Sequence, residues 1–254
     1  MSSVTHLRDV WKQVLLLQRG EVLLQKRMDL HTAGELERIV ISQARGEHDL
    51  KSGGKWQSAK QFRLTGYPIS SAYLVPGGRF FLNLTETAAV VYVDLDGPEF
   101  TWREVIPSSP AGIQHLTVSF EHVVDAPMLT LHVAIAIERH LPPFSSARSE
   151  ELTWEDTPHP VQEISIWRVR PQFDSRGVVC GKLQATRLSQ FRHSPKGIKA
   201  PQVDSIKLQG DHLVVTQNDS PSICSVIQWA AANGLSANVP RKVVSHESCH
   251  VRSP

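Results

Sequence analysis

The sequence has few cysteines and no long hydrophobic segment. Its three cysteines, Cys180, Cys224 and Cys249, are too few and too far apart for a disulfide framework, and an odd number is typical of a reducing compartment. No apolar run approaches the ~18 residues that a membrane span needs. Asp9 and Lys12 interrupt the first apolar stretch, which therefore does not resemble a secretion signal. We expect an intracellular protein, cytoplasmic or nuclear, with no membrane partner.

The sequence also has little net charge and no familiar catalytic motif. Its 27 basic and 25 acidic residues give a formal charge of +2, and no long basic run indicates a nucleic-acid partner. The patterns G-x-S-x-G, G-x-x-x-x-G-K-[ST] and C-x-x-C do not occur. With 41% hydrophobic residues, the chain is expected to be globular. These observations predict a protein that is not an enzyme, with no catalytic residues and no cofactor.

The stretch Ser71–Leu95 predicts three β-strands joined by two turns. Pro76-Gly77-Gly78 ends the first strand, Phe80, Phe81 and Leu82 lie in the second, and Ala88–Leu95 forms the third. Further along, Leu129–Glu138 places leucine, valine or isoleucine at every second of ten positions, alternating with threonine, histidine, alanine and glutamate, which is typical of a strand. The chain is therefore predicted to be mainly β.

The pattern of Ser71–Leu95 returns in Ile206–Trp229, with a Gly turn, an apolar strand, a polar break and a closing apolar strand. Gly78 and Gly210 are 132 residues apart. Because WD-like propeller blades repeat every ~40–45 residues, this offset fits three regular blades or two with long insertions. The long loops between the copies favour two. The segments VVYVDL, EISIWRV and CSVIQW are expected to be the last strands of their blades, with Trp167 and Trp229 in the core.

Two helices are predicted before the β region. Apolar residues share one face of residues 5–18, and Thr32-Ala33-Gly34-Glu35 forms a capping box that starts a second helix. We expect three parts: a helical connector over 1–54, WD-like blades over 55–230 and a flexible tail over 231–254. The predicted fold is an incomplete or divergent β-propeller of three to four WD-like blades with two N-terminal α-helices.

Two long loops are the predicted recognition elements, because loops on a rigid scaffold commonly carry specificity. Arg139–Pro160 is rich in proline and acids, and Phe191–Pro201 is basic. Passive insertions, or loops that attract each other by opposite charge, are the alternatives. The predicted interaction residues are Trp154, Glu155, Asp156, Arg192, His193 and Lys196.

The pentad His246-Glu247-Ser248-Cys249-His250 matches H-E-x-x-H, which in zinc proteases lies on a helix. The flanking residues are poor helix formers, so a chance match is favoured. A zinc-dependent hydrolase, with His246, Cys249 and His250 as metal-ligand candidates, is the rival hypothesis. A third is a degenerate fragment without stable function, whose open sheet edges invite self-association.

The N-terminal region and the blades together resemble fungal F-box proteins. The resemblance rests on Leu7-Arg8-Asp9-Val10-Trp11, on Glu35-Leu36-Glu37-Arg38 in the capped helix, on the boundary at Trp56 and on the propeller-like repeats. It implies a non-enzymatic protein-interaction module that recognises substrates for a ubiquitin ligase. The F-box itself, an L-P-x-E-type segment, is not found in these residues, so only the recognition half is implied.

Overall fold

The computed structural model describes residues 2–17, 24, 26–51, 66, 71–109, 112–123, 129–139, 161–193, 203–217, 223–231 and 241–245. Within these residues the chain is mainly β, as predicted, with two α-helices followed by twelve strands. The strands form three separate four-stranded antiparallel sheets, none of them closed on itself.

The two predicted helices are confirmed. They are α1, Ser2–Leu17, and α2, Ala33–Lys51, with the 3-10 turn η1, Met28–Leu30, between them. The capping box is present, because the Thr32 amide donates to Glu35 Oε2 at 2.7 Å and the Glu35 amide donates to Thr32 Oγ1 at 3.3 Å. The helices share a small apolar core of their own, whose buried members are Leu15, Leu24, Leu36 and Val40.

Each sheet is a meander in which consecutive strands pair. Sheet 1 contains β1, Ser71–Leu74; β2, Phe80–Leu84; β3, Val90–Asp94; and β4, Arg103–Ile106. Sheet 2 contains β5, Ile113–His122; β6, Leu131–Arg139; β7, Val161–Phe173; and β8, Val179–His193. Sheet 3 contains β9, Val203–Gln209; β10, His212–Gln217; β11, Ile223–Gln228; and β12, Arg241–Ser245, and the short turn η3, Trp229–Ala231, follows β11.

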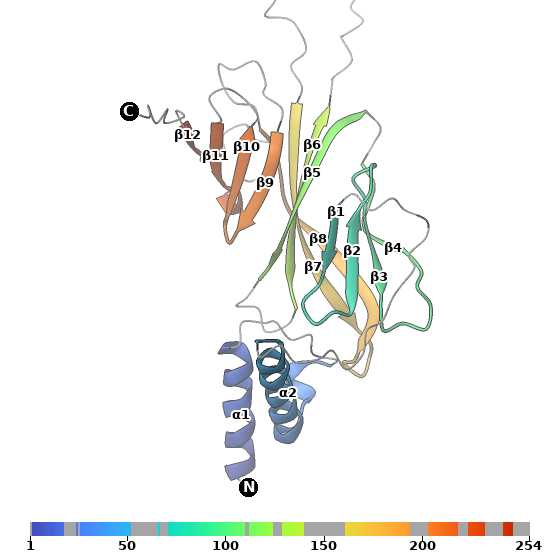
Figure 1. Cartoon of the computed structure of the whole chain (residues 1–254), viewed down its shortest axis with the longest axis vertical. Helices are drawn as coiled ribbons and strands as arrows, with labels where there is room; N and C mark the ends of the chain where they lie inside the picture. Colours follow the sequence, from blue (N-terminus) through green and yellow to red (C-terminus); the bar gives the residue numbers. More distant parts are fainter. Residues whose placement is uncertain are drawn as a thin grey trace, which may run out of the picture.

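Sheet 2 is the middle layer, with sheet 1 on one face and sheet 3 on the other (Figure 1). The alternation in β6 explains this, because successive side chains of a strand point to opposite faces. Val133 and Ile135 pack with sheet 1, whereas Ala134 and Ala136 pack with sheet 3. A strand that is buried on both faces therefore joins two apolar cores.

The sequence repeat corresponds to a structural one. Both copies fold into the first three strands of a sheet, and β10 begins 132 residues after β2, with one whole sheet between the copies. The spacing thus matches two units with long insertions. The prediction that VVYVDL, EISIWRV and CSVIQW are last strands is wrong: β3, β7 and β11 are third strands, each with a partner on both sides.

Two predicted boundaries also need correction, and two others lie outside the described residues. The basic loop does not begin at Phe191, because β8 continues in register with β7 through His193. The tail 231–254 contains β12, which pairs with the edge of β11 from Arg241 to Ser245. The acidic loop lies, beyond residue 139, outside the described residues, as does the predicted boundary at 52–55.

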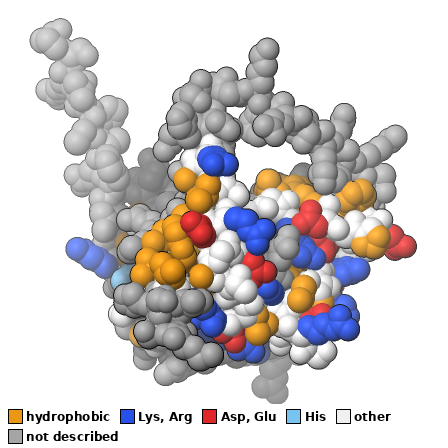
Figure 2. All heavy atoms as spheres, turned by 90° about the horizontal axis from the view of Figure 1, so that it is seen from below, with side chains coloured by type: hydrophobic (Ala, Val, Ile, Leu, Met, Phe, Trp, Pro, Cys, Tyr) orange, Lys and Arg blue, Asp and Glu red, His pale blue; other side chains and the backbone are white. Residues whose placement is uncertain are grey.

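The helical part meets sheet 2 at the β7–β8 turn. The Arg27 amide donates to the Gly177 carbonyl at 2.9 Å, and Lys26 forms an isolated antiparallel bridge with Val178. Seen from this end, the molecule shows a band of hydrophobic side chains beside interspersed basic and acidic groups (Figure 2). Leu7 and Val10 of α1 are exposed. No helix in the described ranges has the length and apolar character needed to cross a membrane.

Candidate interaction site

A slot between sheets 1 and 2 arises from unequal strand lengths. β7 has 13 residues and β8 has 15, whereas β4, which faces them from sheet 1, has only four. Sheet 1 therefore covers only part of the face of sheet 2 that it packs against. The uncovered part forms a cavity of about 500 Å³, which we call the interlayer slot. Its lining residues are Ala88, Ile106, Pro107, Ser108, Ser109, Ile135, Ile137, Glu163, Ser165, Trp167, Arg187, Gln190 and Arg192.

One side of the interlayer slot is apolar. Ile106 ends β4 and is 1% exposed, and Ile135 and Ile137 continue the apolar face of β6. All three belong to the core that joins sheets 1 and 2. This side of the slot is thus a continuation of that core, open toward β7 and β8.

A polar part of the lining lies beside Ile135 and Ile137 on the same face of sheet 2 and comes from alternate residues of β7. Glu163, Ser165 and Trp167 line the slot, whereas Ile164 and Ile166 between them are fully buried against sheet 3. The Trp167 indole Nε1 donates to Ser165 Oγ at 3.0 Å, which fixes the ring. The indole therefore presents a half-buried, oriented aromatic surface to the slot.

Two arginines of β8 complete the polar side. The guanidinium carbon of Arg187 lies 5.8 Å from the centre of the Trp167 ring, in a cation–π arrangement. Arg192 stands opposite Glu163 in the ladder and is exposed. Gln190 donates to Glu163 Oε1. The slot thus has two cations, one carboxylate that already accepts a hydrogen bond, and an aromatic surface.

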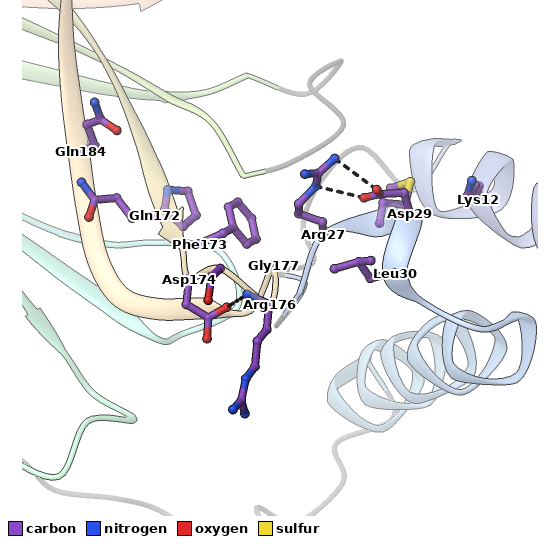
Figure 3. Close-up of a pocket in the computed structure, with 13 residues that line it drawn as sticks. Lys12, Arg27, Asp29, Leu30, Gln172, Phe173, Asp174, Arg176, Gly177 and Gln184 are labelled. Carbon is purple, nitrogen blue, oxygen red and sulfur yellow. Dashed lines mark hydrogen bonds and ion pairs between the residues drawn. The ribbon is translucent and has the colours of Figure 1, made fainter.

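A second and larger cleft lies where the helical part meets the β7–β8 turn (Figure 3). Its volume is about 970 Å³. Its acids already have partners: Asp29 holds Arg27 through two hydrogen bonds of 3.1 Å, and Asp174 Oδ1 accepts the Arg176 and Val178 amides at 2.8 and 2.9 Å. We interpret this cleft as a joint between the two parts of the chain, since both of its acids are engaged with neighbouring groups of the same segment.

The structure places two of the six predicted interaction residues. Arg192 and His193 are neighbours in β8, so their side chains point to opposite faces. Arg192 lines the slot, as an interaction residue would. The surface role predicted for His193 is wrong, because its side chain is 4% exposed and its Nε2 lies 3.4 Å from Gln217 Nε2 between sheets 2 and 3.

The other predicted residues lie outside the described residues. These are Trp154, Glu155, Asp156 and Lys196 of the two loops, and the metal-ligand candidates His246, Cys249 and His250. Within the described part of the chain, no group of three or more His, Cys, Asp or Glu side chains is placed to hold a metal ion.

The slot residues that sequence reasoning missed are Glu163, Trp167, Arg187 and Gln190. The segment EISIWRV contained a signal, because Glu163, Ser165 and Trp167 alternate with two isoleucines and so must share a face. What the sequence did not show was that sheet 1 leaves this face partly uncovered. Trp167, predicted to lie at a blade end or in the core, packs half-buried against the core between sheets 1 and 2 and also lines the slot.

Comparison with known proteins gives no relative: no family model, no curated protein and no solved structure matches the chain.

Proposed function

We propose that this chain is a protein-interaction module built on propeller-like blades, without enzymatic activity of its own, and that the interlayer slot is its contact surface. Three consecutive four-stranded meanders packed face to face are the arrangement of neighbouring blades in a propeller, which supports the fold half of the proposal. Because a fold by itself does not imply a function, the functional half depends on the slot.

The observation that carries the proposal is the chemistry of the slot. Arginine and tryptophan are the residues most enriched at the centres of protein interfaces, and here Arg187 is held against Trp167 next to an apolar wall. The Ser165 hydroxyl oxygen accepts the indole N–H, and the residues that line the slot include no histidine to activate it. Such a surface favours binding over nucleophilic chemistry.

The resemblance to F-box proteins gives this module a biological context. In that context the slot would recognise substrates of a ubiquitin ligase. The partner that the proposal requires is a protein, and neither a membrane nor a nucleic acid.

Site-specific photo-crosslinking tests the proposal. We expect benzoylphenylalanine in place of Gln190 to capture a discrete protein band from native extract under ultraviolet light. The matched control places the same group at Lys182, which is exposed on β8 and does not line the slot. Equal capture from both positions, or none from Gln190, would contradict a contact surface at the slot.

A further inference from the structure

The outer edge of β8 borders the interlayer slot. Within the described residues β8 pairs with β7 alone, so one edge of the strand carries backbone N–H and C=O groups that the sheet itself does not use. Such an edge accepts an extended peptide from another chain, with main-chain hydrogen bonds giving affinity and side-chain contacts giving specificity.

Sheet 1 caps the first half of this edge. The Leu183 amide donates to the Tyr92 hydroxyl at 3.1 Å, and the Gly181 carbonyl accepts from Arg103 Nη1 at 3.1 Å. These two contacts show that the Gly181 carbonyl and the Leu183 amide point outward, away from β7. Because β4 is short, no comparable contact from the described residues of sheet 1 reaches the backbone of Arg187, Gln190 or Arg192.

The register shows which residues of the second half point outward. Backbone groups of an antiparallel strand alternate between its two neighbours, so Ala185 and Arg187 follow Leu183 in pointing away from β7. A bulge follows, because Ile166 stands opposite Ser189 and Trp167 opposite Arg187. It shifts the alternation by one residue, so that Gln190 and Arg192 point outward beyond it.

The residues with outward backbone groups are therefore the same residues whose side chains line the slot. Arg187, Gln190 and Arg192 have outward backbone groups, and the side chains of the same three residues line the slot. A strand that pairs with this edge would place every second side chain beside the two guanidinium groups. Opposite charges at directly paired positions stabilise an antiparallel pair, and like charges destabilise it.

We infer that the second half of β8, residues 185–193, binds an extended acidic peptide segment of a protein partner as an antiparallel fifth strand of sheet 2. Carboxylates of the peptide pair with Arg187 and Arg192 across the strands. This inference rests on the proposed function and specifies its ligand. A second copy of the chain suits the edge less well, because pairing β8 with β8 brings arginines of both copies onto one face.

A dye-labelled peptide of sequence Ser-Glu-Thr-Glu-Val-Glu-Thr-Glu-Ser tests the inference by fluorescence anisotropy with the whole chain. Arg187, Gln190 and Arg192 turn their backbone groups outward, so a peptide residue directly opposite one of them shares its face and exchanges N–H···O bonds with it. We therefore expect N-methylation of the glutamates to weaken binding at least about tenfold, because it removes the amides that face β8. N-methylation of the residues between them should change affinity less than about threefold. Equal effects of the two modifications, or no binding of the parent peptide, would overturn the inference.

Protein variants test the charge contribution. R187E and R192E should each weaken binding about ten- to a hundredfold, because a charge-assisted pair becomes a repulsive one. K182E, on the same strand but away from the slot, should leave affinity unchanged, and circular dichroism of each variant controls for folding. A loss with K182E equal to that with R192E would indicate attraction to net charge only and would contradict the inference. If the crosslink at position 190 persists while the peptide fails to bind, the module stands and the strand mode is refuted. Failure of both refutes both.

Discussion

Replacement of Gly181 by alanine tests the closest approach between sheets 1 and 2. Gly181 has a φ of +72°, and a Cβ built on it would lie 2.4 Å from Asp94 Oδ2. That carboxylate cannot move freely, because it accepts two hydrogen bonds of 2.9 Å from Arg79, and both side chains are largely buried, at 9% and 17% exposure. Alanine in the left-handed region costs about 1–2 kcal/mol. Displacing Asp94 from a charge-assisted hydrogen-bonded pair costs about 1.5–3 kcal/mol more.

We therefore expect G181A to lower the free energy of unfolding by about 2.5–5 kcal/mol, a large part of the stability of a domain this size. Urea denaturation followed by tryptophan fluorescence measures the change. Two alanine variants are matched controls, because nothing lies within 4 Å of the Cβ position at either site. G210A, where φ is +57°, should cost about 1–2 kcal/mol from backbone strain alone. G34A, in the first turn of α2, should gain up to about 1 kcal/mol from helix propensity. If G181A costs no more than G210A, β8 does not approach Asp94 as described.

Three further predictions concern the other contacts that hold the fold together. Y92F removes the hydroxyl that accepts the Leu183 amide and should cost about 1–3 kcal/mol, with faster hydrogen exchange at that amide; unchanged exchange would contradict the contact. T32A removes the cap of α2 and should cost about 1 kcal/mol in thermal denaturation, whereas an unchanged melting temperature would show that the cap is not formed. The Thr32 amide, and then Lys26, hold the pKa of Glu35 at about 2 instead of its ordinary 4.5, so the stabilisation is complete above pH 4.5 and lost as pH falls toward 2. Stability curves of wild type and E35Q over this range should converge at the acid end, and parallel curves would refute the shift.

Most of the strands are predictable from short sequence patterns, because turn residues and alternation involve only neighbouring residues. Proline and glycine at 76–78 turn the chain, and the alternation in Leu129–Glu138 marks a strand whichever neighbour it meets. The repeat offset of 132 residues fits two or three units, and the structure places one four-stranded sheet between the two copies. The third strands were misplaced as last strands because the strands that follow are weakly apolar: Arg103 and Glu104 of β4 are exposed at the edge of its sheet.

The candidate site exists because β4 is much shorter than β7 and β8. These strands lie far apart in the sequence, so short sequence patterns do not predict the slot. Arg192 belongs to a basic stretch whose composition predicts a loop. The structure places it on strand β8, where it lines the slot. Trp167 resembles a core residue because it follows the alternating isoleucines Ile164 and Ile166, which are fully buried. The tryptophan faces the other way, toward a sheet whose last strand has only four residues. Trp167 is therefore partly exposed because β4, some sixty residues earlier in the chain, is short.

The bulge in β8 matters for binding at the open edge of this strand. If the same residues paired with β7 without the bulge, Ser189, Phe191 and His193 would have outward backbone groups and side chains toward the slot, and Arg192 would face sheet 3. With it, the outward set is Gln190 and Arg192, whose side chains line the slot. A single extra residue therefore decides which side chains of the second half of β8 line the slot. Deleting Leu188, the residue that the register leaves unpaired, would give a regular ladder in which Ser189 follows Arg187, so the later side chains would keep the faces that they have now.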